Sequence, residues 1–249
     1  MEMAAPNIVA LRGIEVARGA DVRPAFRINP PLVLGVLLLA SIVLGTLDLV
    51  TLAAKSEIGS DQVRRIFNVD EEVSIPTWFS ILQLIAAALI LGFVAIIRAV
   101  LHDRFAAHWG LLALVMLGLS LDEAAGVHEA GAHVLKTAGF GGQWVILGGL
   151  FAAAVAVFFV RFLLALPRPI ARLFVLAGAV MLAGAIGMES LHLTMWTRDP
   201  SFTGGLVPAI EEFLERTGIA VMIYALLVYV TDYLGFRGIA VAPSAEYGR

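Results

Sequence analysis

Residues 109–136 read WGLLALVMLGLSLDEAAGVHEAGAHVLK. The first half of this stretch is apolar enough to enter a lipid bilayer, and the second half contains Asp122, Glu123, His128, Glu129 and His133. A helix of about 20 apolar residues spans the hydrocarbon core of a membrane. A charged group in the middle of such a helix costs on the order of 2.5–3.5 kcal/mol, so it is expected to face other helices and to be partnered. The stretch therefore predicts a membrane helix that forms part of a buried polar site.

The composition of the whole chain is typical of a polytopic membrane protein. Of its 249 residues, 60% are hydrophobic and 15% are charged, whereas a soluble domain has about a quarter charged residues. The mean hydropathy is +0.91. Cysteine is absent, which excludes disulfides, thiolate metal ligands and cysteine nucleophiles. The Arg-bearing N-terminal segment precedes an apolar run long enough to span, so we interpret it as a tail and not as a signal peptide.

Six segments are long and apolar enough to span a bilayer, which predicts an all-α fold, a bundle of six transmembrane helices over residues 31–236. The expected helices cover about 31–54, 77–100, 109–136, 144–166, 169–196 and 206–234. Residues 1–30 and 237–249 are expected to be polar tails. Pro76, Pro169 and Pro208 stand near expected helix starts, where the missing N–H of proline costs nothing. Residues 144–160 include no ionisable group, so we expect that helix at the lipid-facing periphery.

The distribution of Lys and Arg favours both termini in the cytoplasm. With this orientation eleven basic residues lie on the inner side and five on the outer side; Arg216, inside the sixth helix, is not counted. The inner set is Arg12, Arg18, Arg23, Arg27, Arg98, Arg104, Arg161, Arg168, Arg172, Arg237 and Arg249, and the outer set is Lys55, Arg64, Arg65, Lys136 and Arg198. We therefore expect a multi-pass protein of the cell (plasma or inner) membrane.

This topology places the acids and histidines of distant helices at one depth, near the outer face. Acids outnumber the available cations there, so either several acids are protonated or a cation neutralises them. Carboxylates and imidazoles at i, i+3 and i, i+4 suit zinc, iron or manganese. The predicted ligands of a divalent metal ion are Asp122, His128, Glu129, His133, Glu189, His192, Glu211 and Glu215. Glu123 and Glu212 are predicted to be catalytic, as general bases toward metal-bound water.

Helical spacing supports parts of this hypothesis. At about 100° per residue, Asp122, Gly126, Glu129 and His133 fall on one face of the third helix. The sequence Glu189-Ser-Leu-His192 fits the Glu-x-x-His unit of di-iron carboxylate bundles, whereas the histidine after Glu129 comes one position late.

Simpler roles are open for several of these residues. Glu212 and Arg216 form an i, i+4 pair, and Glu189 with His192 could be a hydrogen-bonded pair that only stabilises the bundle. Three further expectations are that Asp48 caps or pairs with a neighbouring helix, that Asp70, Glu71 and Glu72 form a solvated loop, and that His102 and His108 lie on the surface.

Three stretches together resemble a family of bacterial polytopic membrane proteins of unassigned function. They are IPTWFSILQLIAAALIL at 75–91, SLDEAAGVHEAGAH at 120–133 and AIEEFLERTGIAVMIYALLVYV at 209–230. The resemblance covers most of residues 66–234 and implies the helical architecture and the acid cluster, but no activity. Ser120, Asp122 and the histidines also invite comparison with ceramidase-like zinc hydrolases, whose His-x-x-x-His pair is absent from this chain.

The sequence leaves several functions open. The first is an intramembrane metal site with hydrolytic or redox chemistry on an unknown small molecule or lipid. The second is a proton or cation transporter, which the apolar stretches 110–119 and 219–229 disfavour. The third is a non-catalytic scaffold or sensor. Haem held by His128, His133 or His192 is a further alternative, and nothing indicates nucleic-acid binding.

Overall fold

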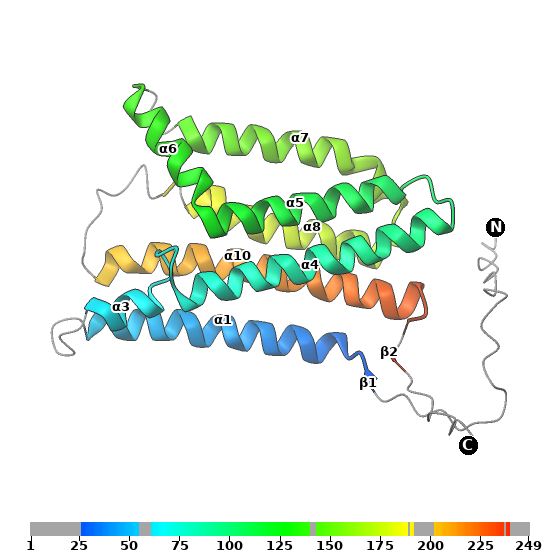
Figure 1. Ribbon diagram of the computed structural model, residues 1–249, viewed down its shortest axis with the longest axis horizontal. Helices are drawn as coiled ribbons and strands as arrows, with labels where there is room; N and C mark the ends of the chain where they lie inside the picture. The colour runs from blue at the N-terminus through cyan, green and yellow to red at the C-terminus, as the bar shows by residue number, and fades with distance from the viewer. Residues whose placement is uncertain are drawn as a thin grey trace, which may run out of the picture. The chain divides into compact units, whose positions relative to one another are not determined.

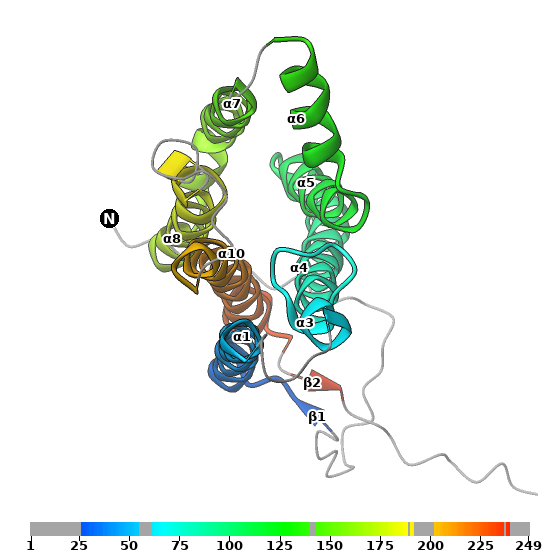
Figure 2. The same ribbon diagram turned by 90° about the vertical axis from the view of Figure 1, so that its left-hand side faces the viewer.

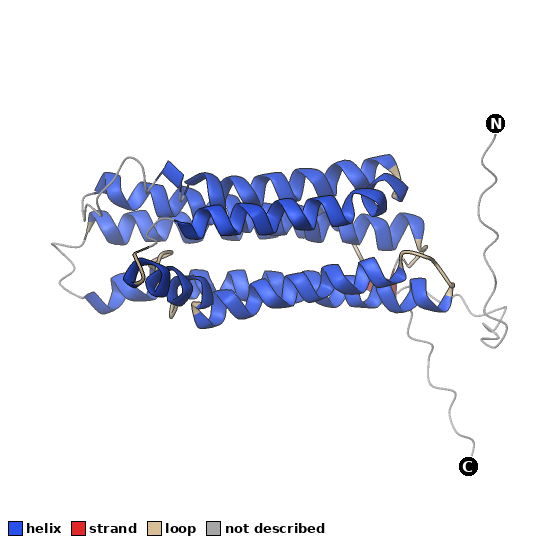
Figure 3. Ribbon diagram, turned by 90° about the horizontal axis from the view of Figure 1, so that it is seen from above, coloured by secondary structure: helices blue, strands red, loops and turns tan. Residues whose placement is uncertain are grey.

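The computed structural model describes residues 26–54, 61–139, 143–188, 190–191, 202–236 and 238–239. These residues are almost wholly helical (Figure 3). Six helices are long and apolar enough to cross a membrane, which confirms the prediction of six long apolar helices. They are α1 (Pro30–Ala53), α4 (Ile75–Val100), α5 (Ala106–Ala125), α7 (Gln143–Ala165), α8 (Arg168–Leu182) with the π-helix η1 (Ala183–Met188), and α10 (Phe202–Val228) with the π-helix η2 (Tyr229–Tyr233).

The remaining elements are short. Two helices, α3 (Asp61–Phe67) and α6 (Val127–Thr137), belong with the long helices to a compact unit over Asn29–Phe236. The strands β1 (Phe26–Arg27) and β2 (Gly238–Ile239) belong to a unit of their own, in which Phe26 pairs with Ile239 and Arg27 with Gly238 in antiparallel register. Sequence patterning missed α3, since seven residues are too few to show an apolar period.

Local sequence sets where two of the long helices begin. The Asn29 side chain accepts a hydrogen bond from the backbone N–H of Leu32 (3.2 Å) at the start of α1, and the Ser74 hydroxyl accepts one from Thr77 N–H (3.2 Å) at the start of α4. Such caps satisfy N–H groups that have no partner inside the helix. Pro208 was expected near the start of the last helix. α10 begins earlier, at Phe202, so this proline lies inside the helix.

The helices form two layers (Figures 1 and 2). α1, α10, α8 and α7 lie in one layer, and α3, α4, α5 and α6 in the other. Glycines permit close packing inside the first layer, as small residues do in transmembrane bundles. A Cβ on Gly218 of α10 would lie 2.7 Å from the backbone nitrogen of Met181, and one on Gly184 would lie 2.8 Å from the carbonyl oxygen of Glu211.

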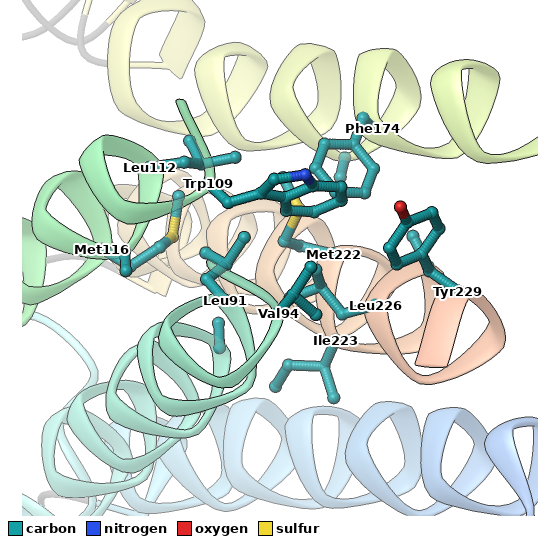
Figure 4. Close-up of a cluster of buried hydrophobic side chains, with 14 of the residues drawn as sticks. Leu91, Val94, Trp109, Leu112, Met116, Phe174, Met222, Ile223, Leu226 and Tyr229 are labelled. Atoms are coloured by element: carbon teal, nitrogen blue, oxygen red, sulfur yellow. The ribbon is translucent and has the colours of Figure 1, made fainter. Parts of the chain in front are cut away.

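One half of the bundle is filled by a cluster of apolar side chains that we call the apolar plug (Figure 4). It consists of Leu91, Val94, Trp109, Leu112, Met116, Phe174, Met222, Ile223, Leu226 and Tyr229. Trp109 is 1% exposed, and its ring centroid lies 4.8 Å from that of Tyr229. Arg98 of α4 donates a hydrogen bond to the Tyr229 hydroxyl. The plug therefore joins α4, α5, α8 and α10.

The outer surfaces of the long helices are apolar. In the most apolar segment of α7 only 11% of the residues are buried, whereas 56% are buried in the corresponding segment of α10. This agrees with the expected peripheral position of α7. His108 corrects another expectation. It is half-buried among phenylalanine rings, stacked on Phe158 and Phe162 at 5.3 and 5.8 Å, because α5 and α7 converge at that end. His102 is exposed.

The predicted helix 109–136 is two helices, which corrects the largest structural expectation. Gly126 has a φ of +55°, a left-handed conformation that ends α5, and α6 then leaves in another direction (Figure 1). Asp122, Gly126, Glu129 and His133 therefore do not form a stripe on one helix. Sequence periodicity could not reveal this, because a lone glycine is also tolerated inside a helix.

Candidate functional site

The contacts around Tyr229 set the relative heights of three helices. Tyr229, the first residue of η2 after α10, contacts Arg98 of α4 and Trp109 of α5. Counting thirteen residues from Arg98, Trp109 and Tyr229 toward the other end of the bundle gives a rise of about 20 Å. The residues reached are residue 85 of α4, Asp122 of α5 and Arg216 of α10. The predicted acids of α5 and α10 are thus at one height, at the end of the bundle away from the plug.

Arg216 lies at the centre of this acidic end. Its side chain is 0% exposed, and it donates a hydrogen bond to the Glu212 carboxylate at 3.0 Å, so the expected i, i+4 pair is present. Further acids interact with its charge, in decreasing order after Glu212: Glu123, Glu215 and Asp48. The Nε and Nη2 atoms of Arg216 have no hydrogen-bond partner among the described residues.

Glu123 and Glu215 interact across the two layers. Among charged groups, Glu123 of α5 acts most strongly on Glu215 of α10, followed by Glu211. Both side chains are partly buried. Arg216 acts most strongly among charged groups on Glu123, followed by His128, and it also acts on Glu215. Glu123, Glu212 and Glu215 therefore share the one guanidinium of Arg216. A pair of this kind is suited to a bound cation or to a shared proton.

Asp122 and His128 connect α5 to α6 across the break at Gly126. One Asp122 carboxylate oxygen accepts the backbone N–H of His128 at 2.7 Å, and the other lies 3.0 Å from His128 Nδ1. The Asp122 carboxylate thus takes the place of a cap at the start of α6. This role competes with metal ligation by Asp122, because both of its oxygens are already engaged.

Asp48 joins the acidic end through α3. It is 1% exposed, forms an ion pair with Arg64 of α3, and accepts the backbone N–H of Val69 at 3.4 Å. The expectation that Asp48 pairs with a neighbouring helix agrees with this contact. Its second oxygen has no partner in the part of the chain that the structure describes.

Two acids in the segment before α4 reach the acidic end, a role that the sequence did not predict. Asp70, Glu71 and Glu72 lie in a turn outside the helices, and Asp70 and Glu72 are exposed, which agrees with the expected solvated loop. The Glu72 carboxylate also lies against Gly126, where a Cβ would be 1.6 Å from one of its oxygens. Asp70 acts electrostatically on Glu212, and Glu72 on Glu123. Glu71 forms a 3.3 Å ion pair with the exposed Arg65.

Buried polar atoms without a partner form a second group that sequence reasoning missed. Gln83 of α4 is 2% exposed, and neither atom of its amide has a hydrogen-bond partner among the described residues. The buried hydroxyl oxygen of Thr217 also has no hydrogen-bond partner among the described residues. By the register above, Gln83 lies near the height of Glu215. A glutamine in an apolar span was the available signal, since polar residues in such helices are rare.

A π-helix adjoins the acids on the side of α8. η1 places Gly184 against α10, where a Cβ would lie 2.8 Å from the carbonyl oxygen of Glu211 and from Cγ of Glu215. Short π-helical segments occur frequently at functional sites. Here the backbone of η1 at Gly184 comes close to Glu211 and Glu215, which are two of the predicted ligands.

The remaining predicted ligands are not brought to this site or are not described. His133 is exposed on α6 beyond the break, because α6 turns away from α5. The backbone of Glu129 is described but its side chain is not, and Glu189 and His192 lie outside the described residues. Within the described ranges no group of three or more His, Asp and Glu side chains is placed to hold a metal ion. The metal site therefore stays a prediction.

A family model, Domain of unknown function (DUF8692), matches residues 32–230. No curated protein and no solved structure matches the chain. The family match confirms the resemblance to a family of unassigned function, and it spans all six long helices.

Proposed function

The chain belongs to the DUF8692 family, and from this premise we propose that it is a multi-pass membrane protein that binds a divalent metal ion. The ion would be zinc, iron or manganese, bound near the outer face of a cell membrane with both termini in the cytoplasm. Six long apolar helices with apolar outer surfaces support the membrane part of the proposal.

The interaction between Glu123 and Glu215 is the observation that carries the metal part. The two residues belong to helices of different layers (Figure 2), and each lies fourteen residues from the contact between Trp109 and Tyr229, which places them at the same height. Arg216, the buried cation beside them, is already bonded to Glu212. Like charges brought together away from water are unfavourable unless they are protonated or neutralised by a cation. A divalent ion between Glu123 and Glu215 would neutralise them, with Glu211, Glu129, Glu189 and His192 as further candidate ligands.

Hydrolysis is the reaction class that such a site supports best. A divalent ion lowers the pKa of a bound water toward neutrality, and a carboxylate outside the coordination sphere can accept the proton. Glu212 is suited to be that base if its bond to Arg216 opens, and Glu123 is suited if Glu215 binds the metal. Redox chemistry would need the fuller carboxylate set of a di-metal site.

Transport of protons or cations is less well supported. The plug fills the space between α4, α5 and α10 beyond the acids with Leu, Val, Trp, Phe, Met and Ile side chains (Figure 4). A path for ions needs polar groups along its length. The polar end and the apolar end of the bundle together favour a pocket over a channel.

Elemental analysis of the detergent-purified full chain tests the proposal. We expect zinc, iron or manganese in near-stoichiometric amount, and we expect Glu123→Gln and Glu215→Gln each to lower it severalfold. Glu71→Gln is the matched control, because Glu71 also belongs to the acidic end but pairs with the exposed Arg65. An optical spectrum of the same sample would show a Soret band if haem were bound instead.

Other results would contradict the metal site. Metal-free protein, or a metal content equally insensitive to all three substitutions, would leave the acids as protonated or purely structural groups. If the protein carried cations into liposomes and Glu215→Gln abolished this flux, transport would be the better description of its function.

A further inference from the structure

Exposed arginines gather at the end of the bundle away from the acids. At this end α5 begins, α7 ends and α8 begins (Figure 1). The Trp109 ring of α5 joins the three helices, because its centroid lies 4.9 Å from that of Phe162 of α7 and 5.9 Å from that of Phe174 of α8. Four exposed arginines stand close in sequence to these rings and form what we call the arginine corner: Arg104, Arg161, Arg168 and Arg172.

The positive charge of the arginine corner is not balanced by neighbouring acids. None of its four members forms an ion pair with an acid among the residues that the structure describes. Asp103, the acid next to Arg104, pairs instead with Arg98 at 3.4 Å and accepts the backbone N–H of Phe105 at 2.8 Å. The guanidinium of Arg104 lies over the Phe105 ring, 4.7 Å from its centroid. The arginine corner is therefore a basic surface that is open to an anionic partner.

Two of these arginines share one exposed face of α8 with apolar side chains. Arg168 and Arg172 are four residues apart, about one helical turn. Val175 and Leu182 continue the same face toward the middle of the bundle and are 56% and 36% exposed. The face thus has two guanidinium groups at its end and apolar side chains along its length. A phospholipid has the same order, with a charged head followed by hydrocarbon chains.

The start of α8 adds to the attraction for an anion. Pro167 precedes the helix and gives it no side-chain hydrogen bond, and the first turn contains no acid. The positive end of a helix dipole stabilises anions and disfavours cations. Arg168 and Arg172 therefore stand where the dipole opposes their charge, and an anion between them would relieve this repulsion.

We propose that the arginine corner binds the phosphate of an anionic phospholipid, with Arg168 and Arg172 as the main contacts and the acyl chains along Val175 and Leu182. Basic clusters at the membrane surface attract anionic head groups, and a guanidinium can bind phosphate through two parallel hydrogen bonds. The proposal rests on the membrane part of the proposed function. It does not rest on the metal site, which would lie at the opposite end of the bundle.

Native mass spectrometry of the detergent-purified full chain tests the proposal with two added lipids. Phosphatidylglycerol is anionic, whereas phosphatidylcholine has the same phosphate but no net charge, so we expect phosphatidylglycerol to bind more tightly. Arg172→Gln should weaken its binding about fivefold, the effect of one arginine at an anionic surface, and the double variant Arg168→Gln, Arg172→Gln should weaken it further. Arg65→Gln is the matched control, because Arg65 is also exposed but belongs to α3.

A conservative variant separates a loss of charge from a loss of fold. Arg172→Lys keeps the charge and should retain more of the binding than Arg172→Gln, and the melting temperatures of both variants without added lipid should stay close to that of the unaltered chain. Inorganic phosphate should not displace the lipid, because it lacks the acyl chains that contact α8.

Three outcomes overturn the proposal. They are equal binding of the two lipids, a lipid preference that Arg65→Gln lowers as much as the double variant does, and displacement of the lipid by inorganic phosphate. The metal site fails separately. A metal-free protein that prefers phosphatidylglycerol would refute the metal site alone, and a metal-loaded protein without this preference would refute the lipid site alone. A chain that stays in solution without detergent would contradict the membrane part and the lipid site together.

Discussion

Arg216 shows how one residue organises the polar end. A fully buried guanidinium is costly in an apolar bundle unless acids surround it. Here Glu212 bonds to it, and Glu123, Glu215 and Asp48 interact with its charge. The pair with Glu212 was predictable from i, i+4 spacing alone. Arg216 also interacts with Glu123 of α5 and Asp48 of α1. Residue spacing along α10 cannot predict these interactions, because they depend on how the other helices pack against α10.

Removal of the Arg216 charge is expected to be costly. Arg216→Met should destabilise the protein by about 3–5 kcal/mol, because it leaves buried acids without their cation. The double variant Arg216→Met, Glu212→Leu should recover part of this loss, since both members of the bonded pair are then apolar. Thermal unfolding in detergent measures the effect. Arg65→Gln, which breaks the exposed pair with Glu71, should cost under about 1 kcal/mol; an equal loss for Arg65 and Arg216 would argue against a central role for Arg216.

The break between α5 and α6 is the element that separates the predicted ligands. It depends on the left-handed Gly126, on the Glu72 carboxylate that lies against it, and on the Asp122 bonds to His128. The break turns α6 away from the axis of α5 and toward α7, which leaves His133 exposed while Glu123 interacts with Glu215 of α10. A straight helix would have placed these residues differently. The local geometry of one glycine therefore decides which acids can meet.

Gly126→Ala tests the break. A left-handed conformation costs an L-residue about 1–2 kcal/mol, and the new Cβ would also collide with Glu72. Gly139→Ala is the control, because Gly139 has a φ of +86° but open space around it. Thermal unfolding should rank Gly126→Ala as the more destabilising, and Glu72→Ala in the Gly126→Ala background should bring the loss close to that of Gly139→Ala. Equal losses for the two single glycine variants would show that Glu72 does not press on Gly126.

At the scale of the whole molecule, the bundle has one polar and one apolar end. The acids of α5 and α10 lie about 20 Å from the Tyr229 level, and the apolar plug fills the other end of the bundle. The proposed metal site lies at the polar end, so the orientation of the bundle decides which side of a membrane that site would face.

The absence of native cysteine permits a direct test of that orientation. Ser244→Cys in the C-terminal tail should react with a membrane-impermeant maleimide only after the cells are permeabilised. Ser56→Cys, in the segment between α1 and α3, and Ser201→Cys, directly before α10 in the sequence, should react in intact cells. The reverse pattern would place the acids on the cytoplasmic side, and reaction of all three positions in intact cells would contradict a bundle with six spans.

The sequence by itself determined the number of long apolar helices, their approximate positions except for the end of the third, and the end of the bundle at which acids gather. Helix length and hydropathy are local properties, and residue number along a helix fixes depth, so both can be read from the chain. Only the tertiary structure decided that Gly126 is left-handed, that Glu72 and Arg64 reach the acidic end, and that Glu123 and Glu215 interact while His133 does not join them. These features depend on helix rotation and on contacts between distant segments, which arise from packing and have no periodic signature in the sequence.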